Sequence, residues 1–304
     1  MSRFLVVGDA ILDVTVAPSR PVRAGGDVPA VIRLGPGGQG ANVAVRLARR
    51  GEQVGLLAPI ADDAGGRLLR ESLVADGVEV LSMPVTRSAV VVALLDAGGE
   101  RSMLSDRQAI AAEDAAGALD HGDWIHVSAY ALLDDVNGDG LAVALGARGA
   151  DVRLSLAGGS IPPEPAVVAR FLGRMANARP DVVVVSRDEA AALLGRPSEM
   201  AREAARRLAE RAPIVVVTAG SAGSAAASGG SVVAVPAPDV PGPTLDATGA
   251  GDAFVAALIS RLAGGSWPPG EAALQAGMEE GSQAGALVAR VVGAQARVAG
   301  ERAP

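Results

Sequence analysis

The chain alternates short, uninterrupted apolar runs with longer amphipathic stretches. The apolar runs are Phe4–Gly8, Val54–Leu57, Trp124–Val127, Val152–Leu156, Val182–Val185 and Ile214–Thr218. Strands that are apolar on both faces must be covered on both faces, as in a parallel sheet whose strands are joined by crossover helices. The pattern therefore predicts an α/β fold in three layers, with a mostly parallel central sheet between helices such as Ala41–Arg50 and Gly66–Ala75.

Two segments interrupt this alternation. Residues 13–34 hold several Pro and Gly residues and the alternating run Val28–Leu34, and residues 89–104 read as a hairpin with a turn at Asp96–Gly99. Neither segment contains a crossover helix, so we expect a small antiparallel sheet that stands away from the main one. Such a sheet suits a lid over a cleft or a dimer interface; an excursion without function is the alternative. No linker divides the chain, so residues 1–304 are expected to form a single domain.

The composition excludes several kinds of chemistry. All 27 basic residues are arginine and cysteine is absent. There is therefore no Walker A lysine, Schiff-base lysine, catalytic thiolate or Cys-ligated metal. The two histidines, His121 and His126, leave little material for a His-based metal site or a Ser-His-Asp hydrolase, and we expect both to be structural. If phosphate is handled here, backbone amides and arginine must do it.

The net charge of −7 argues against a nucleic-acid-binding surface, which normally carries a basic face. No run of about 18 apolar residues is present for a membrane helix. The start, Met1–Leu5, leads directly into a strand and lacks the apolar core of a signal peptide. We therefore expect a cytoplasmic protein with neither nucleic acid nor membrane as a partner.

A Gly-rich turn near the C-terminus, Asp246–Asp252, leads into the expected helix Ala253–Leu262. Glycines ahead of a helix let backbone N–H groups converge, and the helix dipole favours negative charge at that point. Asp252 stands at the edge of this anion hole. A carboxylate there suits a general base that takes a proton from an attacking hydroxyl. The alternative is an N-cap aspartate on a Gly-rich turn.

A second Gly-rich stretch, Gly35–Asn42, also opens a helix. It contains the spacing G-x-G-x-x-G, with Asp62 and Asp63 about 20 residues further on, as in a dinucleotide fingerprint. That match is weak because the stretch does not follow the first strand. A second interpretation lets a hydroxylated ligand approach the glycines, with the Asn42 amide as donor and acceptor. A purely structural turn is the third.

Together the two stretches closely resemble the two signatures of the PfkB carbohydrate kinases, the ribokinase-like family, and the resemblance runs from Phe4 to about Val292. It implies ATP-dependent phosphorylation of a hydroxyl on a sugar or nucleoside, with Mg²⁺ carried by the nucleotide. Asp252 would be the general base, and the amides of Gly249, Ala250 and Gly251 would hold the charge on the transferring phosphate. Residues 13–34 and 89–104 would form the lid, through which the family also makes dimer contacts.

The resemblance also assigns binding residues. The substrate side would comprise Asp13, Gly37, Gly38, Asn42 and Arg107. The nucleotide side would comprise Thr218, Gly220, Thr248, Gly249 and Gly251. Glu189 would act indirectly on Mg²⁺ and phosphate, and Asp246 would help bind a monovalent cation such as K⁺. Arg107 could reach an acidic group of the substrate or simply be solvated.

The chain departs from the family pattern at three places. Ser186 stands where the family has the Asn of Asn-x-x-Glu, Gln39 stands where ribokinases have lysine, and Gln108-Ala109-Ile110 stands where the family has Gly-Ala-Asn. The last of these changes weakens any claim to ribose itself. Two other functions stay open at this point: a nicotinamide-dependent oxidoreductase built on the early Gly-rich stretch, and a binding regulator that has lost catalysis.

Overall fold

The computed structural model describes residues 3–96, 101–197 and 200–302. Its main sheet has nine strands in the order β13-β12-β11-β10-β9-β8-β1-β4-β5. The strands are β1 (Arg3–Val7), β4 (Gln53–Pro59), β5 (Glu79–Met83), β8 (Trp124–Ser128), β9 (Arg153–Ala157), β10 (Val182–Ser186), β11 (Ile214–Thr218), β12 (Ser224–Ser228) and β13 (Ser231–Val235). Strands β5 to β11 in this order are parallel. The expected mostly parallel sheet is confirmed.

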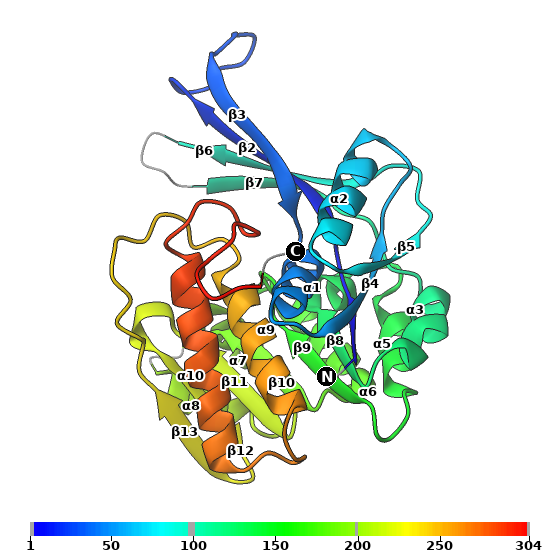
Figure 1. The fold of residues 1–304 in the computed structure, drawn as a ribbon, viewed down its shortest axis with the longest axis vertical. Helices are drawn as coiled ribbons and strands as arrows, with labels where there is room; N and C mark the ends of the chain where they lie inside the picture. Colours follow the sequence, from blue (N-terminus) through cyan, green and yellow to red (C-terminus); the bar gives the residue numbers. More distant parts are fainter. Residues whose placement is uncertain (1–2, 97–100, 198–199, 303–304) are drawn as a thin grey trace.

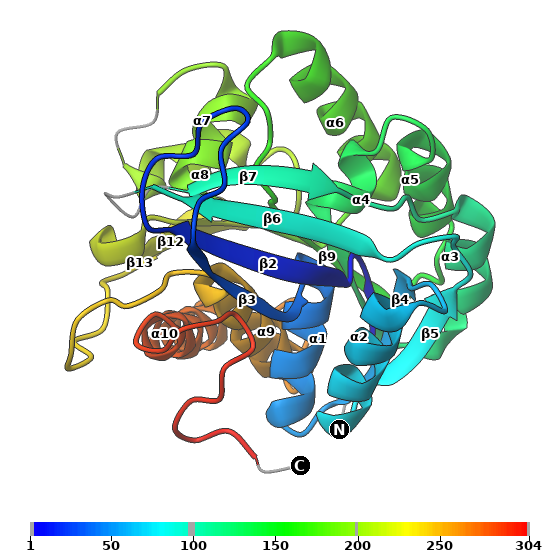
Figure 2. The same ribbon diagram turned by 90° about the horizontal axis from the view of Figure 1, so that it is seen from above.

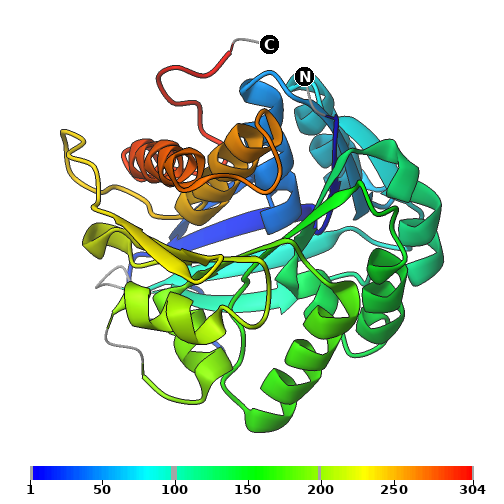
Figure 3. The same ribbon diagram turned by 90° about the horizontal axis from the view of Figure 1, so that it is seen from below.

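Helices cover both faces of this sheet (Figures 1 and 3). One layer holds α1 (Gln39–Arg49), α2 (Ala64–Ala75), α9 (Ala250–Ala263) and α10 (Glu271–Val288). The other holds α3 (Ala112–Ala118), α4 (Ala129–Leu133), α5 (Gly138–Gly146), α6 (Pro165–Ala178), α7 (Arg187–Leu194) and α8 (Ala201–Leu208). Strand β1 shows why the runs are continuously apolar: Phe4 and Val6 pack into the first layer, whereas Leu5 and Val7 pack into the second.

The smaller sheet lies over one end of the main one, in the order β3-β2-β6-β7 (Figure 2). Its strands are β2 (Ile11–Pro18), β3 (Ala30–Gly37), β6 (Ala89–Leu95) and β7 (Arg101–Asp106). Both hairpins are antiparallel as expected, and they join through a parallel pairing of β2 with β6. Of the turn predicted at Asp96–Gly99, residues 97–99 lie outside the described residues. We call this sheet the lid.

The main departures from the predicted elements lie at one edge and at helix starts. Strands β12 and β13 extend the sheet antiparallel, with a short, small-residue strand that carries little apolar signal. Helix α9 begins at Ala250 and not at Ala253, so the Gly-rich turn runs directly into the helix. No helix among the described residues is long and apolar enough to cross a bilayer.

Candidate active site

The carboxyl ends of the parallel strands meet at the edge of the sheet that lies beneath the lid (Figures 1 and 2). Ligands of open α/β sheets bind at this edge, near the point where the strand order reverses. Here β1 is that point, because the chain goes from β1 to β4 on one side and later returns to β8 on the other. The two Gly-rich stretches both reach this region.

The late stretch forms a tight turn that starts helix α9. Gly249 is the N-cap, with φ of +80°, and a Cβ atom added there would come 2.9 Å from Ala294. Glycine is therefore required both by the left-handed conformation and by space. The Ala250 N–H donates to the Ala247 carbonyl at 3.2 Å, and no atom lies within 4 Å of a Cβ added at Gly251. The interpretation of Asp252 as an N-cap is wrong, because Asp252 is the third residue of the helix.

Asp252 is held by a partner from the early Gly-rich stretch. The Asn42 side chain, on α1, donates from Nδ2 to Asp252 Oδ2 at 2.7 Å. Burial raises the pKa of Asp252 from 3.8 to about 7, and the nearby Asp9 charge adds to this rise. The hydrogen bonds from Asn42 and Gln39 and the positive charge of Arg46 oppose it. A carboxyl group with a pKa near 7 is suited to accept a proton at neutral pH.

The early glycines allow α1 to approach β1 closely enough for this contact. Gly38 has φ of +99° and is the N-cap of α1, and a Cβ atom added at Gly40 would come 2.7 Å from Gly8 Cα. The Asp9 carbonyl accepts from the Ala41 N–H at 3.0 Å. These glycines therefore have a structural role, and that role places Asn42 beside the Gly-rich turn Asp246–Asp252.

The dinucleotide interpretation does not fit this geometry. Gly35 and Gly37 belong to lid strand β3 and not to a turn after the first strand. Asp63 caps α2 by accepting from the Gly66 N–H at 2.7 Å and from the Ser88 N–H at 2.9 Å. The Ser88 and Gly66 hydrogen bonds lower the pKa of Asp63 to about 2. This carboxylate is already used in holding the chain and is not presented to a ribose.

Asp9 is a site residue that the sequence reasoning missed. It is buried, accepts from the Gly40 N–H at 3.1 Å through Oδ1, and forms an ion pair with Arg107 through Oδ2. The Arg107 guanidinium also lies 3.7 Å from the centre of the Tyr130 ring. Arg107 is therefore not simply solvated. A Gly-Asp pair directly after a buried strand is the signal that could have identified Asp9.

A cavity of about 200 Å³ lies beside this ion pair. Asp9, Arg107, Gln108 and Tyr130 are among its lining residues. Two further predicted substrate residues lie together at the base of the lid: the Asp13 carboxylate, on β2, is in contact with Gly37 at the end of β3. The lid and the main sheet thus bring polar groups to the same edge.

The predicted nucleotide residues lie at the end of β11 and in the Gly-rich turn Asp246–Asp252. Thr218 is the last residue of β11, and Gly220, with φ of +55°, opens a short 3-10 turn, Gly220–Ala222. Thr248 donates from Oγ1 to Asp246 Oδ1 at 2.6 Å. Asp246 also accepts from the Gly293 N–H at 3.0 Å, and this hydrogen bond connects the Gly-rich turn Asp246–Asp252 to the segment after α10.

Glu189 and Ser186 form a reciprocal cap at the start of α7. Ser186 Oγ accepts from the Glu189 N–H at 3.2 Å, and Glu189 Oε2 accepts from the Ser186 N–H at 2.7 Å. Glu189 Oε1 accepts from the Ser160 N–H at 3.0 Å. Ser186 therefore caps α7 from the position at which the family has asparagine, and it keeps the glutamate at the end of β10.

Gln39 and His126 both make structural contacts at or within the main sheet. Gln39 accepts from Ser128 Oγ at 2.5 Å and donates to the Gly158 carbonyl, so its amide links the ends of β8 and β9. His126 is fully buried beside Ser155, and burial lowers its pKa to about 3. A neutral, enclosed imidazole is structural, as expected.

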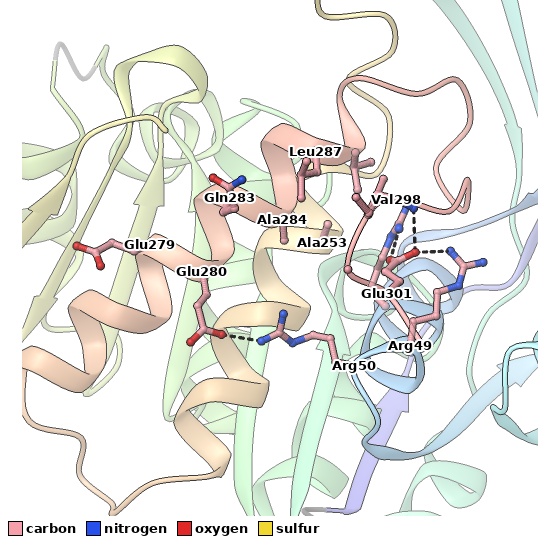
Figure 4. A pocket seen from close by; sticks show the side chains of 14 residues that line it. Arg49, Arg50, Ala253, Glu279, Glu280, Gln283, Ala284, Leu287, Val298 and Glu301 are labelled. Atoms are coloured by element: carbon pink, nitrogen blue, oxygen red, sulfur yellow. Dashed lines mark hydrogen bonds and ion pairs between the residues drawn. The ribbon is translucent and has the colours of Figure 1, made fainter. Parts of the chain in front are cut away.

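A larger cavity, of about 410 Å³, lies away from the lid between α1, α9, α10 and residues 298–301 (Figure 4). Its charged groups are largely paired with one another, for example Arg50 with Glu280 at 2.6 Å and Arg49 with Glu301 at 3.3 Å. Its walls include apolar side chains such as Leu287. We therefore assign the chemistry to the edge beneath the lid.

Comparison with known proteins extends the similarity over nearly the whole chain. The model of the pfkB family carbohydrate kinases matches residues 1–299. A fructokinase from Klebsiella pneumoniae is 32% identical over 276 residues, which cover 85% of this chain and 87% of that protein. An aminoimidazole riboside kinase from Salmonella typhimurium is 28% identical over 281 residues, 86% of this chain and 81% of that protein. The crystal structure of a Vibrio cholerae fructokinase with fructose, ADP and calcium bound has a TM-score of 0.77 and 28% identity, covering 97% of this chain and 95% of that one.

Proposed function

The chain belongs to the pfkB family of carbohydrate kinases, which makes it a sugar phosphotransferase, and we propose that it transfers the γ-phosphate of ATP to a sugar hydroxyl with Asp252 as general base. The observation that carries this proposal is the Asp252 carboxyl, which has a pKa near 7 and receives a hydrogen bond from Asn42 beneath the lid. The intact Asp252 and its turn also favour a catalyst over a binding regulator.

In the proposed reaction the substrate hydroxyl loses its proton to Asp252 while its oxygen forms a bond to the γ-phosphorus. The bond from that phosphorus to the leaving oxygen of ADP breaks, so charge moves toward the nucleotide. The amides of Gly249, Ala250 and Gly251 lie at the N-terminus of α9, where the helix dipole favours negative charge. The Ala250 N–H, which donates to the Ala247 carbonyl at 3.2 Å in this structure, would exchange that bond for one to the phosphate. This arrangement stabilises the transferring phosphate without a lysine.

Substrate orientation falls to groups on both sides of the cleft. Asn42 and Asp13 supply hydrogen-bonding groups to sugar hydroxyls, and Gly37 and Gly38 allow close approach. Arg107, held by Asp9 and Tyr130, supplies a fixed set of donors. Closure of the lid over this end excludes water and so limits hydrolysis of ATP.

The nucleotide would extend over Thr218, Gly220 and Thr248 at the ends of β11 and the catalytic turn. Mg²⁺, when bound with ATP, neutralises phosphate charge. Glu189 fits an indirect role because both of its oxygens are held by backbone N–H groups at the sheet edge. Asp246 and the Thr248 hydroxyl are hard oxygen donors of the kind that a monovalent cation such as K⁺ takes.

Fructose is the first acceptor to test, because the relatives with fructokinase names cover most of this chain. A nucleoside is the second candidate, supported by the similarity to an aminoimidazole riboside kinase. The larger apolar side chains Val31, Ile32, Leu34, Met103 and Leu104 are all more than half exposed on the lid strands. Their exposure supports a homodimer formed through the lid, which sedimentation velocity would test.

The proposed function is tested by a coupled ADP-release assay with Mg-ATP and K⁺. The panel holds fructose, ribose, fructose phosphates, 2-keto-3-deoxygluconate, adenosine and pseudouridine. Turnover with a sugar, lost in Asp252→Asn while ATP binding is retained, is the expected result. Binding of ATP with no turnover on any acceptor would instead favour a non-catalytic binder.

A further inference from the structure

The segment that follows α10, residues 289–302, lies across α1, and we call it the C-terminal strap. Two arginines of α1 hold it. Arg46 donates to the Ala294 carbonyl at 2.6 Å, and Arg49 donates to the Gln295 carbonyl at 2.8 Å. Glu301 near the end of the strap forms ion pairs with both, at 2.5 and 3.3 Å (Figure 4). The strap is thus fixed on the helix that carries Asn42.

One side chain of the strap reaches the active site. Gln295 donates from Nε2 to Asn42 Oδ1 at 3.0 Å, and Asn42 in turn donates from Nδ2 to Asp252 Oδ2 at 2.7 Å. The three side chains therefore form a directed chain of hydrogen bonds that runs from the strap through α1 to α9. Gln295 is partly buried, and its hydrogen bond to Asn42 links it to Asp252.

The orientation of the Asn42 amide decides how this chain of hydrogen bonds affects Asp252. A carboxamide has one acceptor and one donor end of similar shape, and it can turn to exchange them. In this structure the Gln295 N–H faces Asn42 Oδ1, and this hydrogen bond favours the orientation with Oδ1 toward the strap and Nδ2 toward Asp252. In the opposite orientation an oxygen would face the Asp252 carboxylate, which would disfavour its ionised form.

The amide oxygen of Gln295 indicates that a gain in stability is not the reason for a glutamine at this position. Gln295 Oε1 is buried and has no hydrogen-bond partner among the described residues. A buried acceptor without a partner lowers stability. An apolar side chain would avoid this loss, so the donor end is the part of the amide that the structure uses.

We propose that Gln295 is a positioning residue for the phosphoryl transfer: it favours the orientation of the Asn42 amide that donates to Asp252 and thereby favours the ionised form of the general base. The proposal rests on the proposed function of Asp252. It assigns to the C-terminal strap a role in catalysis, in addition to its packing against α1.

The test compares Gln295→Met, which removes the donor at similar size, with Gln295→Glu, whose carboxylate accepts where glutamine donates. Gln275→Met, at an exposed position on α10, is the matched control. For each variant kcat, both KM values and the pH dependence of kcat are measured with the acceptor found in the panel. Circular dichroism and Tm report folding.

We expect Gln295→Met to lower kcat about three- to tenfold at pH 7, with the KM for ATP unchanged. The acid limb of its kcat–pH profile should move to higher pH. Without the Gln295 donor the Asn42 amide is free to turn away from Asp252, and the effect of burial on the pKa of Asp252 is then less opposed. Gln295→Glu should move the limb further, because its carboxylate turns the Asn42 N–H toward the strap. The control should match the wild type.

An acid limb that stays in place in both Gln295 variants overturns the proposal, even if kcat or Tm falls, because a packing role would not set the pKa of the base. If one variant fails to fold, the other decides, since each removes the donor by different chemistry. Full turnover in Asp252→Asn would instead overturn the proposed function itself, whatever the Gln295 variants do.

Discussion

Asn42 and Asp252 are 210 positions apart in the chain, and a 2.7 Å hydrogen bond joins their side chains. Each residue stands in the first turns of a helix that a Gly-rich stretch begins. The bond therefore connects the helix expected to meet the sugar with the helix expected to meet the phosphate.

Asp252→Asn removes the proposed proton acceptor and keeps the size of the side chain. We expect kcat to fall about 10²- to 10⁴-fold, because that is the usual contribution of a positioned general base. ATP affinity, measured by calorimetry, should stay within about twofold of the wild type. A variant that keeps more than about a tenth of the wild-type kcat would contradict the assignment.

The pH dependence of kcat should reflect the raised pKa of Asp252. The base is active when it is ionised, so kcat should rise with pH through about 7. A limb centred near the ordinary value of 3.8 would contradict the effect of burial. The measurement is a series of initial rates at saturating substrates, with coupling enzymes in excess at each pH.

The same carboxyl group should affect stability in a defined pH window. The folded protein retains a proton on Asp252 up to about pH 7, whereas the unfolded chain loses it near 3.8. The free energy of unfolding therefore falls as pH rises from about 4 to 7, because in this window the folded state holds a proton that the unfolded chain has lost. Asp252→Asn should have a higher Tm than the wild type at pH 8 and a similar Tm below pH 4. Equal Tm values at pH 8 would contradict the prediction.

Two neighbouring glycines should behave differently when they are substituted. Gly251→Val should fold normally, since a Cβ there meets no atom within 4 Å, but it should lose turnover because the side chain blocks approach of the phosphate. Gly249→Ala should also lose stability, since φ is +80° and Ala294 is 2.9 Å from the added Cβ. Tm and kcat measured together separate the two effects, and near-normal turnover in Gly251→Val would contradict the anion hole.

Asp13→Asn should act on the acceptor side. The carboxylate lies at the lid base against Gly37, remote in sequence from the catalytic turn. We expect the KM for the sugar to rise about tenfold or more, since hydrogen bonds to a charged group are among the stronger ones. The KM for ATP should stay unchanged. A rise in both KM values would indicate a general effect on lid closure.

Much of the fold follows from local patterns in the sequence. The continuous apolar runs predict strands that are covered on both faces, and alternate residues of β1 do pack into opposite layers. The antiparallel strands β12 and β13 escape this reasoning, because β12 consists of Ser and Ala residues whose burial depends on neighbours. The sequence pattern also starts α9 at Ala253 and not at Ala250, because the Gly251 within its first turn gives no helical signal.

The sequence by itself determines the family, the two Gly-rich turns and Asp252, because each is a local pattern with its own chemical consequence. Only the tertiary structure pairs Arg107 with Asp9 and places Gln295 against Asn42. These side chains come from segments far apart in the chain, and their pairing depends on how helices and loops pack. For the same reason the pKa of Asp252 is a property of the fold, since burial raises it and neighbouring side chains such as Asn42 and Asp9 shift it further.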